Sequence, residues 1–226
     1  MLRLAMHSYA EKNDSYFGNA RKDISHLLPA QLGNVLEIGC GSGATLAWLK
    51  STGRCQSTTG IELFEAAAAQ ALRQVDRVLC GPAETMLNEL PAEQQFDVVL
   101  CLDVLEHMVD PWAFVAQLVP RVRPGGLMIS SIPNVRFIGV LGPLLVQGRW
   151  RYREEGVLDR THLRFFTRKS ALELMRTDGL EFVSCHGNVP PLRTLVGKFD
   201  RLSLGLLKEF SAYGWLVSSR RAESAR

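Results

Sequence analysis

Short apolar runs alternate with helical segments along most of the chain, and the first run ends in a glycine-rich turn. The run Val35–Ile38 is followed by Gly39–Gly43, with the sequence GCGSG, and a helical pattern begins at Ala44. Glycine lets the backbone turn sharply and approach a ligand closely, and the first N–H groups of the helix then face a polar or anionic group. This pattern predicts a parallel sheet with crossover helices and a ligand at the first turn.

We expect residues 1–226 to form a single α/β domain. Its sheet should be seven-stranded, mostly parallel and Rossmann-like, with helices on both faces and an antiparallel C-terminal hairpin. The near-continuous apolar run Phe96–Leu102 is typical of a central strand buried on both faces. The other strands are predicted at 35–38, 58–63, 77–80, 126–132, 180–185 and 213–218. Helices are predicted at 44–50, 64–74, 84–90, 111–119 and 167–177.

Two segments interrupt this alternation. Residues 1–30 are expected to form an N-terminal helical cap. Residues 133–165 are rich in Gly, Arg and aromatic side chains and have no clean period, so we interpret them as an inserted lid or substrate-facing segment. Within it, a basic-aromatic patch either binds phosphate groups or a membrane surface or is simply a solvated face. The patch consists of Arg149, Trp150, Arg151, Tyr152 and Arg153.

Composition narrows the class of protein. The formal net charge of +3 is too small to indicate nucleic acid as a partner, and none is expected. The five cysteines are odd in number and widely spaced, which suits reduced thiols better than disulfides or a zinc site. No signal peptide is recognisable and the longest apolar stretch is too short to span a bilayer, so a cytoplasmic location is expected. Peripheral membrane contact and the oligomeric state are left open.

A carboxylate ends the second predicted strand, at Glu62 in the run Thr59–Glu62. In nucleotide-binding sheets a carboxylate at this point accepts hydrogen bonds from ribose hydroxyls. The glycine-rich turn also fits a variant of the dinucleotide fingerprint, so these two motifs alone leave open an NAD(P)-dependent oxidoreductase or epimerase. We expect Glu62 to be an exposed strand-end residue that contributes little to stability.

Four segments together are more specific. Glu37–Gly43 resembles the first motif of class I S-adenosylmethionine-dependent methyltransferases, and Gly60–Glu62 is similar to their second-strand acidic motif. Asp97–His107 resembles their fourth-strand segment and Arg123–Leu127 the turn before their fifth strand. All four occur in the family's order. The chain resembles in particular the ubiquinone-biosynthesis O-methyltransferases and bacterial polysaccharide-associated methyltransferases.

The resemblance implies S-adenosyl-L-methionine as the cofactor. Glu37 would orient the loop or the amino group of the ligand, Glu62 would hold the ribose hydroxyls, and Leu63 would lie against the adenine. Many relatives carry Asp after the third strand, where it accepts a hydrogen bond from the adenine amino group. Here Pro82 stands in that region, so the backbone of Ala83 or the side chain of Glu84 would accept that hydrogen bond. The residues implied for the cofactor are Glu37, Gly39, Cys40, Gly41, Gly43, Glu62, Leu63, Ala83, Glu84, Leu102 and Asp103.

The implied reaction is methylation of oxygen on a small molecule or glycan intermediate. His107 and His162 are the candidate bases, since an imidazole titrates near neutral pH. His107 alternatively caps a helix or loop, and the segment around His162 alternatively only packs and caps. Acceptor contacts are expected from Tyr9, Asn134, Asp159 and Arg164.

No metal is expected, although one alternative is open. Asp103, Glu106 and His107 are similar to the divalent-metal segment of the ubiquinone-biosynthesis enzymes. A different class, a non-catalytic methyltransferase-fold binding protein, should show damaged glycine or acidic positions, and those positions are intact.

Overall fold

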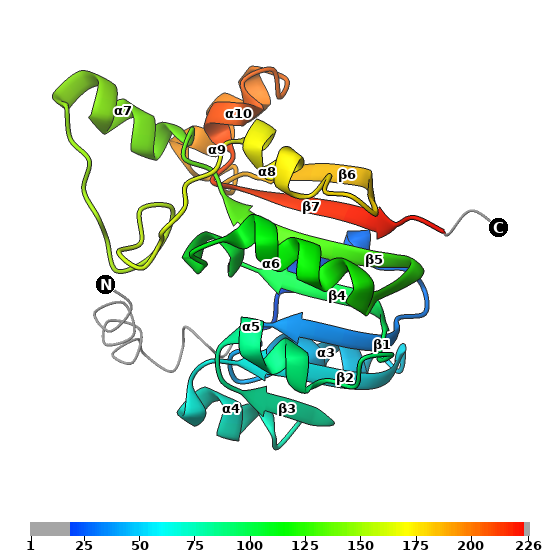
Figure 1. Cartoon of the computed structure of the whole chain (residues 1–226). Helices are drawn as coiled ribbons and strands as arrows, with labels where there is room; N and C mark the ends of the chain where they lie inside the picture. Colours follow the sequence, from blue (N-terminus) through cyan, green and yellow to red (C-terminus); the bar gives the residue numbers. More distant parts are fainter. Residues whose placement is uncertain (1–18, 224–226) are drawn as a thin grey trace.

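Residues 19–223 of the computed structural model are described, and they form a seven-stranded sheet (Figure 1). The strand order is β3-β2-β1-β4-β5-β7-β6. Strands β3 to β5 pair in parallel, whereas β7 runs antiparallel between β5 and β6. The predicted fold class is therefore confirmed. The strands are β1 (Gly33–Ile38), β2 (Cys55–Glu62), β3 (Arg77–Cys80), β4 (Phe96–Leu102), β5 (Val122–Pro133), β6 (Leu180–Asn188) and β7 (Gly214–Arg221).

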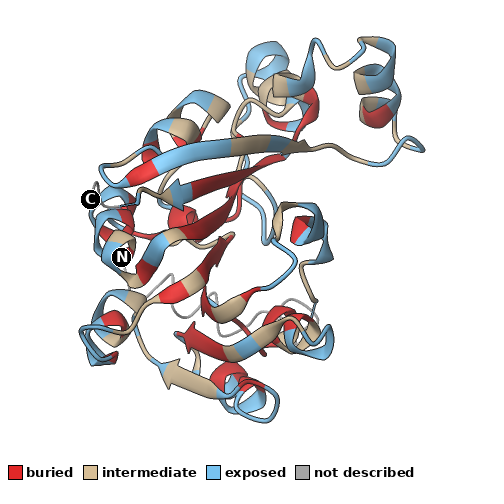
Figure 2. Ribbon diagram, turned by 90° about the vertical axis from the view of Figure 1, so that its right-hand side faces the viewer, coloured by how far each residue is buried: buried red, intermediate tan, exposed pale blue. Residues whose placement is uncertain are grey.

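Helices cover both faces of the sheet because its strands are apolar on both sides (Figure 2). Leu36 and Val99 point into one core cluster with the helices after β3 and β4, while Val35 and Val98 point into a second cluster with the helix after β1. The α-helices are α3 (Ala44–Ser51), α4 (Glu65–Ala71), α5 (Ala83–Met86), α6 (Pro111–Leu118), α7 (Ile138–Gln147), α8 (Arg168–Leu174), α9 (Leu195–Leu202) and α10 (Lys208–Ser211). Short 3-10 helices are η1 (Lys22–Leu27), η2 (Leu87–Glu89), η3 (Leu105–His107) and η4 (Val119–Arg121).

The register of the central strands brings their carboxyl ends to one edge. Ile38 of β1 pairs with Ile61 of β2 on one side and with Cys101 of β4 on the other. On β5, Ser131 pairs with Leu102. The loops that follow β1, β2, β4 and β5 therefore leave the sheet side by side, where such folds collect their ligands.

The segment between β5 and α8 differs from its sequence-based description. It contains the ten-residue helix α7, which protrudes from the body at the carboxyl end of β5 (Figure 1). Pro143 inside this helix and its many exposed apolar side chains hide the usual helical period, and Gly148, with φ of 61°, ends it. The predicted N-terminal cap lies mostly outside the described residues; within them it contributes η1. None of the helices in residues 19–223 has the length and apolarity needed to cross a bilayer.

The central position of β1 generates a stability prediction. Leu36 is fully buried, and Leu36→Ala should lower the free energy of unfolding by about 2–5 kcal/mol because it removes packed methyl groups and leaves a cavity. The matched control is Leu72→Ala, since Leu72 is 59% exposed and should change stability by less than about 0.5 kcal/mol. Urea unfolding of both variants measures the difference. Equal losses would contradict the central role of β1.

Candidate active site

The glycine-rich turn after β1 adopts a backbone that side chains disfavour. Gly39, Gly41 and Gly43 have φ angles of 67°, 54° and 82°, in the left-handed region. A Cβ on Gly39 would lie 2.6 Å from a methyl group of Val104. The N–H groups of Gly39 and Cys40 both donate to the carbonyl of Ile61, at 2.7 and 3.1 Å. The turn is thus locked against the end of β2, and Gly43 leads directly into α3.

Glu62 ties the first two strand ends together. Its carboxylate accepts hydrogen bonds from the N–H of Gly41 at 2.8 Å and from the N–H of Phe64 at 2.9 Å. Burial raises the pKa of Glu62, and these N–H donors act in the opposite direction. The expectation of an exposed strand-end residue is wrong, because the side chain is only 4% exposed. The glycine turn holds the Glu62 side chain in place, so Glu62 contributes to the stability of the structure as well as to the predicted site.

Glu37 is a buried carboxylate with an unsatisfied oxygen. Its side chain is 3% exposed, and Oε2 has no hydrogen-bond partner among the described residues. Burial raises the pKa of Glu37 to about 8, although a hydrogen bond with Thr45 and the charge of Arg21 lower it. An unpartnered buried carboxylate oxygen is costly unless a donor or cation meets it. The position next to the glycine turn therefore fits the ammonium group of an amino-acid ligand.

Asp103 is held by a residue that the sequence analysis did not identify. Arg21 forms an ion pair with Asp103 Oδ2, and its Nη2 donates to Ser131 Oγ at 3.0 Å. Ser131 Oγ in turn donates to Asp103 Oδ1 at 2.7 Å. Asp103 is also one of two non-glycine residues with positive φ in the described chain, at 57°. No local motif marks Arg21, because its partner lies 82 residues away.

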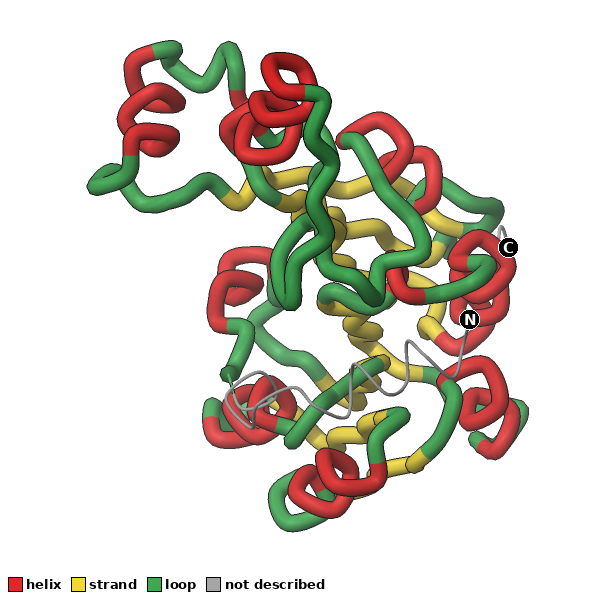
Figure 3. The backbone as a smooth tube through the Cα atoms, turned by 90° about the vertical axis from the view of Figure 1, so that its left-hand side faces the viewer, coloured by secondary structure: helices red, strands yellow, loops and turns green. Residues whose placement is uncertain are grey.

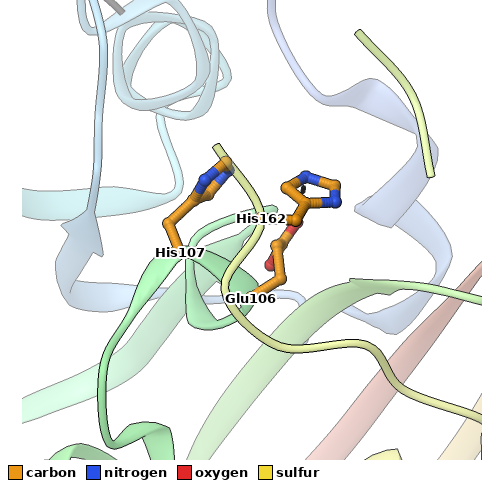
Figure 4. Close-up of side chains that lie close together, drawn as sticks. All are labelled: Glu106, His107 and His162. Atoms are coloured by element: carbon orange, nitrogen blue, oxygen red, sulfur yellow. Dashed lines mark ion pairs between the residues drawn. The ribbon is translucent and has the colours of Figure 1, made fainter. Parts of the chain in front are cut away.

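A second polar cluster lies just beyond β4, where η3 meets the loop before α8. Single ligand atoms of Glu106, His107 and His162 all lie within 4.8 Å of one another (Figure 4). The two imidazole rings are 4.7 Å apart between centroids, and His162 Nε2 is 3.8 Å from Glu106 Oε1. Glu106 is fully buried, which raises its pKa well above the ordinary value. The fold thus brings together two histidines from distant segments, which the sequence analysis named as separate candidate bases.

Backbone contacts orient both rings. His107 Nδ1 lies 3.1 Å from the carbonyl oxygen of Thr161, and His162 Nδ1 lies 3.0 Å from that of Val157. A carbonyl oxygen only accepts, so each Nδ1 carries the proton and Nε2 keeps its lone pair. The loop is held to η3 as well, because the N–H groups of Leu163 and Arg164 donate to the carbonyl of Glu106, at 2.8 and 2.9 Å.

The remaining predicted residues fall into different settings. Asp159 is buried and accepts from the N–H and hydroxyl of Thr161, at 2.9 and 2.6 Å. Asn134 is buried and donates to the carbonyls of Glu209 and Ala212, and Arg164 binds the carbonyl of Val109. Their acceptor roles stay predictions.

At the cofactor edge, Leu63 is 39% exposed, Leu102 ends β4, and Ala83 and Glu84 open α5. Tyr9 lies outside the described residues.

Comparison with known proteins decides the family. Residues 9–185 match the Methyltransferase domain family. The chain is a class I S-adenosylmethionine-dependent methyltransferase. This membership removes the oxidoreductase and the non-catalytic binding protein as alternatives.

Relatives and solved structures agree with this assignment. The methyltransferase is 33% identical over 163 residues to the ubiquinone biosynthesis O-methyltransferase of Pseudomonas aeruginosa strain LESB58, covering 66% of this chain and 68% of that protein. It is 30% identical over 169 residues to the enzyme of that name from Idiomarina loihiensis, covering 69% and 68%. Its fold is similar to a SAM-dependent methyltransferase from Archaeoglobus fulgidus, with a TM-score of 0.67, 16% identity and coverage of 97% and 99%.

The residues present fit S-adenosylmethionine. Glu37 Oε2, which has no hydrogen-bond partner among residues 19–223, would meet the ammonium group. The left-handed glycines give the backbone room for close approach, and Glu62 at the end of β2 would meet the ribose hydroxyls. When bound, the cofactor supplies a methyl carbon activated by its sulfonium. The protein contributes the geometry in which that carbon is presented.

Glu37 generates a prediction about stability and binding. Its pKa is raised on folding, so the ligand-free protein loses this contribution to stability as the pH rises from about 4.5 to about 8. Glu37→Gln cannot ionise and should therefore raise the Tm relative to wild type more at pH 8 than at pH 5, by about 2–4 °C for each kcal/mol. The same variant should weaken binding of S-adenosylhomocysteine, because an amide is a poorer partner for an ammonium group.

Differential scanning fluorimetry and calorimetry without and with ligand provide both measurements. The control is Glu181→Gln, which removes an exposed carboxylate on the edge strand β6, away from the predicted cofactor residues. A Tm difference that is the same at both pH values would refute the assigned ionisation of Glu37.

Proposed function

We propose that this methyltransferase transfers the methyl group to an oxygen of a small molecule or glycan intermediate. The observation that carries the proposal is the histidine pair beside buried Glu106, at the sheet edge shared with the glycine turn. The relatives named above, whose names include O-methyltransferase, support oxygen as the accepting atom. A hydroxyl is a weak nucleophile until its proton is removed, so such a reaction needs a base beside the acceptor.

His107 and His162 supply that base. The backbone carbonyls of Thr161 and Val157 hold the Nδ1 protons, so a lone pair on Nε2 takes the proton from the acceptor hydroxyl. His162 Nε2 also lies near Glu106 Oε1, and once the proton has arrived the positive imidazolium and the ionised form of this buried carboxyl favour one another. His107 is the more accessible of the two rings, so we assign it to the acceptor and His162 with Glu106 to the developing charge.

The inserted segment is the acceptor side of the site in this proposal. His162 belongs to the loop after α7, and that loop is bound to η3 by backbone hydrogen bonds to Glu106. Asp159 shapes the loop through Thr161, and Asn134 fixes the point where the segment leaves β5. In this proposal the segment 133–165 thus places His162 beside His107, next to the cofactor site at the ends of the central strands.

The base assignment predicts a pH profile. Activity should rise with pH and be lost on the acid side, because the neutral imidazole is the competent form. His107→Gln or His162→Gln should lower kcat by about 10²–10⁴-fold and leave S-adenosylhomocysteine binding intact. The control is His26→Gln, since His26 contacts His186 and belongs to a different cluster. Wild-type rates in both single variants would remove the histidines from the mechanism.

A bound divalent ion is the competing source of activation, since Glu106, His107 and His162 offer one carboxylate and two imidazole ligands. The metal alternative in the sequence analysis used Asp103, which instead pairs with Arg21 and Ser131. We favour the metal-free route because that engagement leaves the cluster one carboxylate short. Activity should then survive extensive dialysis against EDTA. Loss of activity in EDTA with recovery in Mg²⁺ would replace the base mechanism by metal activation.

A further inference from the structure

The loop between α7 and α8 is closed by its own backbone hydrogen bonds. It crosses the edge of the sheet where β4 ends (Figures 1 and 3), and there it is bound to η3. The N–H of Arg153 donates to the carbonyl of Leu158 at 2.8 Å, and the N–H of Arg160 donates to the carbonyl of Arg153 at 3.0 Å. Residues 153–160 therefore form a narrow turn, and Asp159 lies where this turn meets the histidine pair.

Asp159 is a buried carboxylate in this turn. It is 2% exposed, and its Oδ1 accepts hydrogen bonds from the N–H of Thr161 at 2.9 Å and from the hydroxyl of Thr161 at 2.6 Å. Its backbone carbonyl accepts from the N–H of His162 at 3.1 Å. Taking a carboxylate out of water is costly unless hydrogen-bond donors replace the water. The two bonds from Thr161 meet this requirement and fix the conformation of Thr161 as well.

The peptide unit between Thr161 and His162 is thus held on its N–H side by Asp159. A trans peptide unit is planar, so its N–H and its C=O point in opposite directions. The N–H of this unit points at the carbonyl of Asp159, and its C=O therefore points away, toward Nδ1 of His107 at 3.1 Å. The side-chain bonds to Thr161 anchor the residue that carries this carbonyl. Asp159 thereby sets the direction of the carbonyl that His107 meets.

The Thr161 carbonyl decides which nitrogen of His107 carries the proton. A neutral imidazole has its proton on either Nδ1 or Nε2, and the nitrogen without the proton keeps the lone pair. The hydrogen bonds of the ring set which form is present. Because the carbonyl accepts only from a protonated Nδ1, it favours the form of His107 with the lone pair on Nε2. With this carbonyl turned away, both forms would be populated.

We propose that Asp159 is a positioning residue that keeps the proton of His107 on Nδ1 by fixing the carbonyl of Thr161. This role rests on the proposed function, in which the lone pair on Nε2 takes the proton of the acceptor. Asp159 acts through Thr161 in this role, in place of the acceptor contact expected from the sequence. His162 is an internal comparison, because its Nδ1 faces the carbonyl of Val157 instead.

Nitrogen NMR of the full chain with isotopically labelled histidine rings locates these protons. At about pH 8 a neutral imidazole gives distinct ring signals for its two forms, and the variants His107→Gln and His162→Gln assign the signals. In the wild-type protein both rings should carry the proton on Nδ1. Asp159→Ala should change the ratio of the two forms of His107 by at least about threefold, as expected for lost hydrogen bonds of ordinary strength, and leave His162 unchanged. A wild-type ratio at His107 would overturn the proposal.

Two further variants separate positioning from a general loss of structure. Asp159→Asn keeps an oxygen that accepts from Thr161, so it should restore the wild-type ratio, and a ratio like that of Asp159→Ala would overturn the hydrogen-bond role. Leu158→Ala removes a buried apolar side chain next to Asp159 but none of the side-chain hydrogen bonds of Asp159. It should lower the Tm and leave the His107 ratio unchanged. An equal change of the ratio in Leu158→Ala would show that loop stability, and not Asp159, sets the ring.

Thr161→Val provides the same test if Asp159→Ala fails to fold. It removes the hydroxyl that donates to Oδ1 and keeps the N–H that does so, and the His107 ratio should change in the same direction by a smaller factor. An unchanged ratio would again overturn the proposal.

The methylation rate of His107→Gln tests the proposed function separately. A wild-type rate in that variant would remove the base and leave the positioning of the ring by Asp159 intact. A His107 ratio that does not respond to Asp159 would overturn the positioning role and leave the base assignment.

Discussion

The burial of carboxylates at one edge of a parallel sheet is the constraint on which this structure depends. Glu37, Glu62 and Glu106 each lie within or just after a central strand, and each is almost fully buried. Taking an ionised carboxylate out of water is costly unless donors or cations replace the water. Of the three, Glu62 alone accepts backbone N–H hydrogen bonds at both carboxylate oxygens, from Gly41 of the glycine turn and from Phe64. Such arrangements are typical of functional sites rather than of stabilising ones.

In the proposed function, the other two carboxylates lie in different halves of the site. On the cofactor side, Glu37 has an oxygen with no hydrogen-bond partner among the described residues. It lies beside a turn in which Gly39 and Gly43 have no room for a side chain. Glu106 faces the histidine pair on the acceptor side. Asp103 lies between them in sequence, and its ion pair with Arg21 brings the N-terminal segment onto the end of β4. The two halves are therefore connected by the few residues that follow the buried strand β4, among which Asp103 has a positive φ.

The two halves are built differently. The cofactor half consists of strand ends and tight turns whose positions follow from sheet register, with Ile38 paired to β2 and β4 at once. The proposed acceptor half comes from the loop between α7 and α8, which is held by backbone hydrogen bonds to Glu106 and by the aromatic contacts around Phe165. Loops on a rigid scaffold vary readily, so one cofactor site serves many acceptors in such folds. The helix α7 belongs to this variable half.

Local pattern in the sequence determined the strands, the glycine turn and the acidic strand end, because apolar periodicity and glycine placement act over a few residues. This local pattern was enough to predict the sheet and the family. It was insufficient for α7, where Pro143 and exposed leucines obscure the period, and for the burial of Glu62, which depends on the neighbouring turn. Only the tertiary structure determined the ion pair of Arg21 with Asp103 and the contact between His107 and His162. The two residues of the first pair are 82 positions apart in the sequence and those of the second are 55 apart. Only the folding of the whole chain sets which of these distant side chains meet at one edge of the sheet.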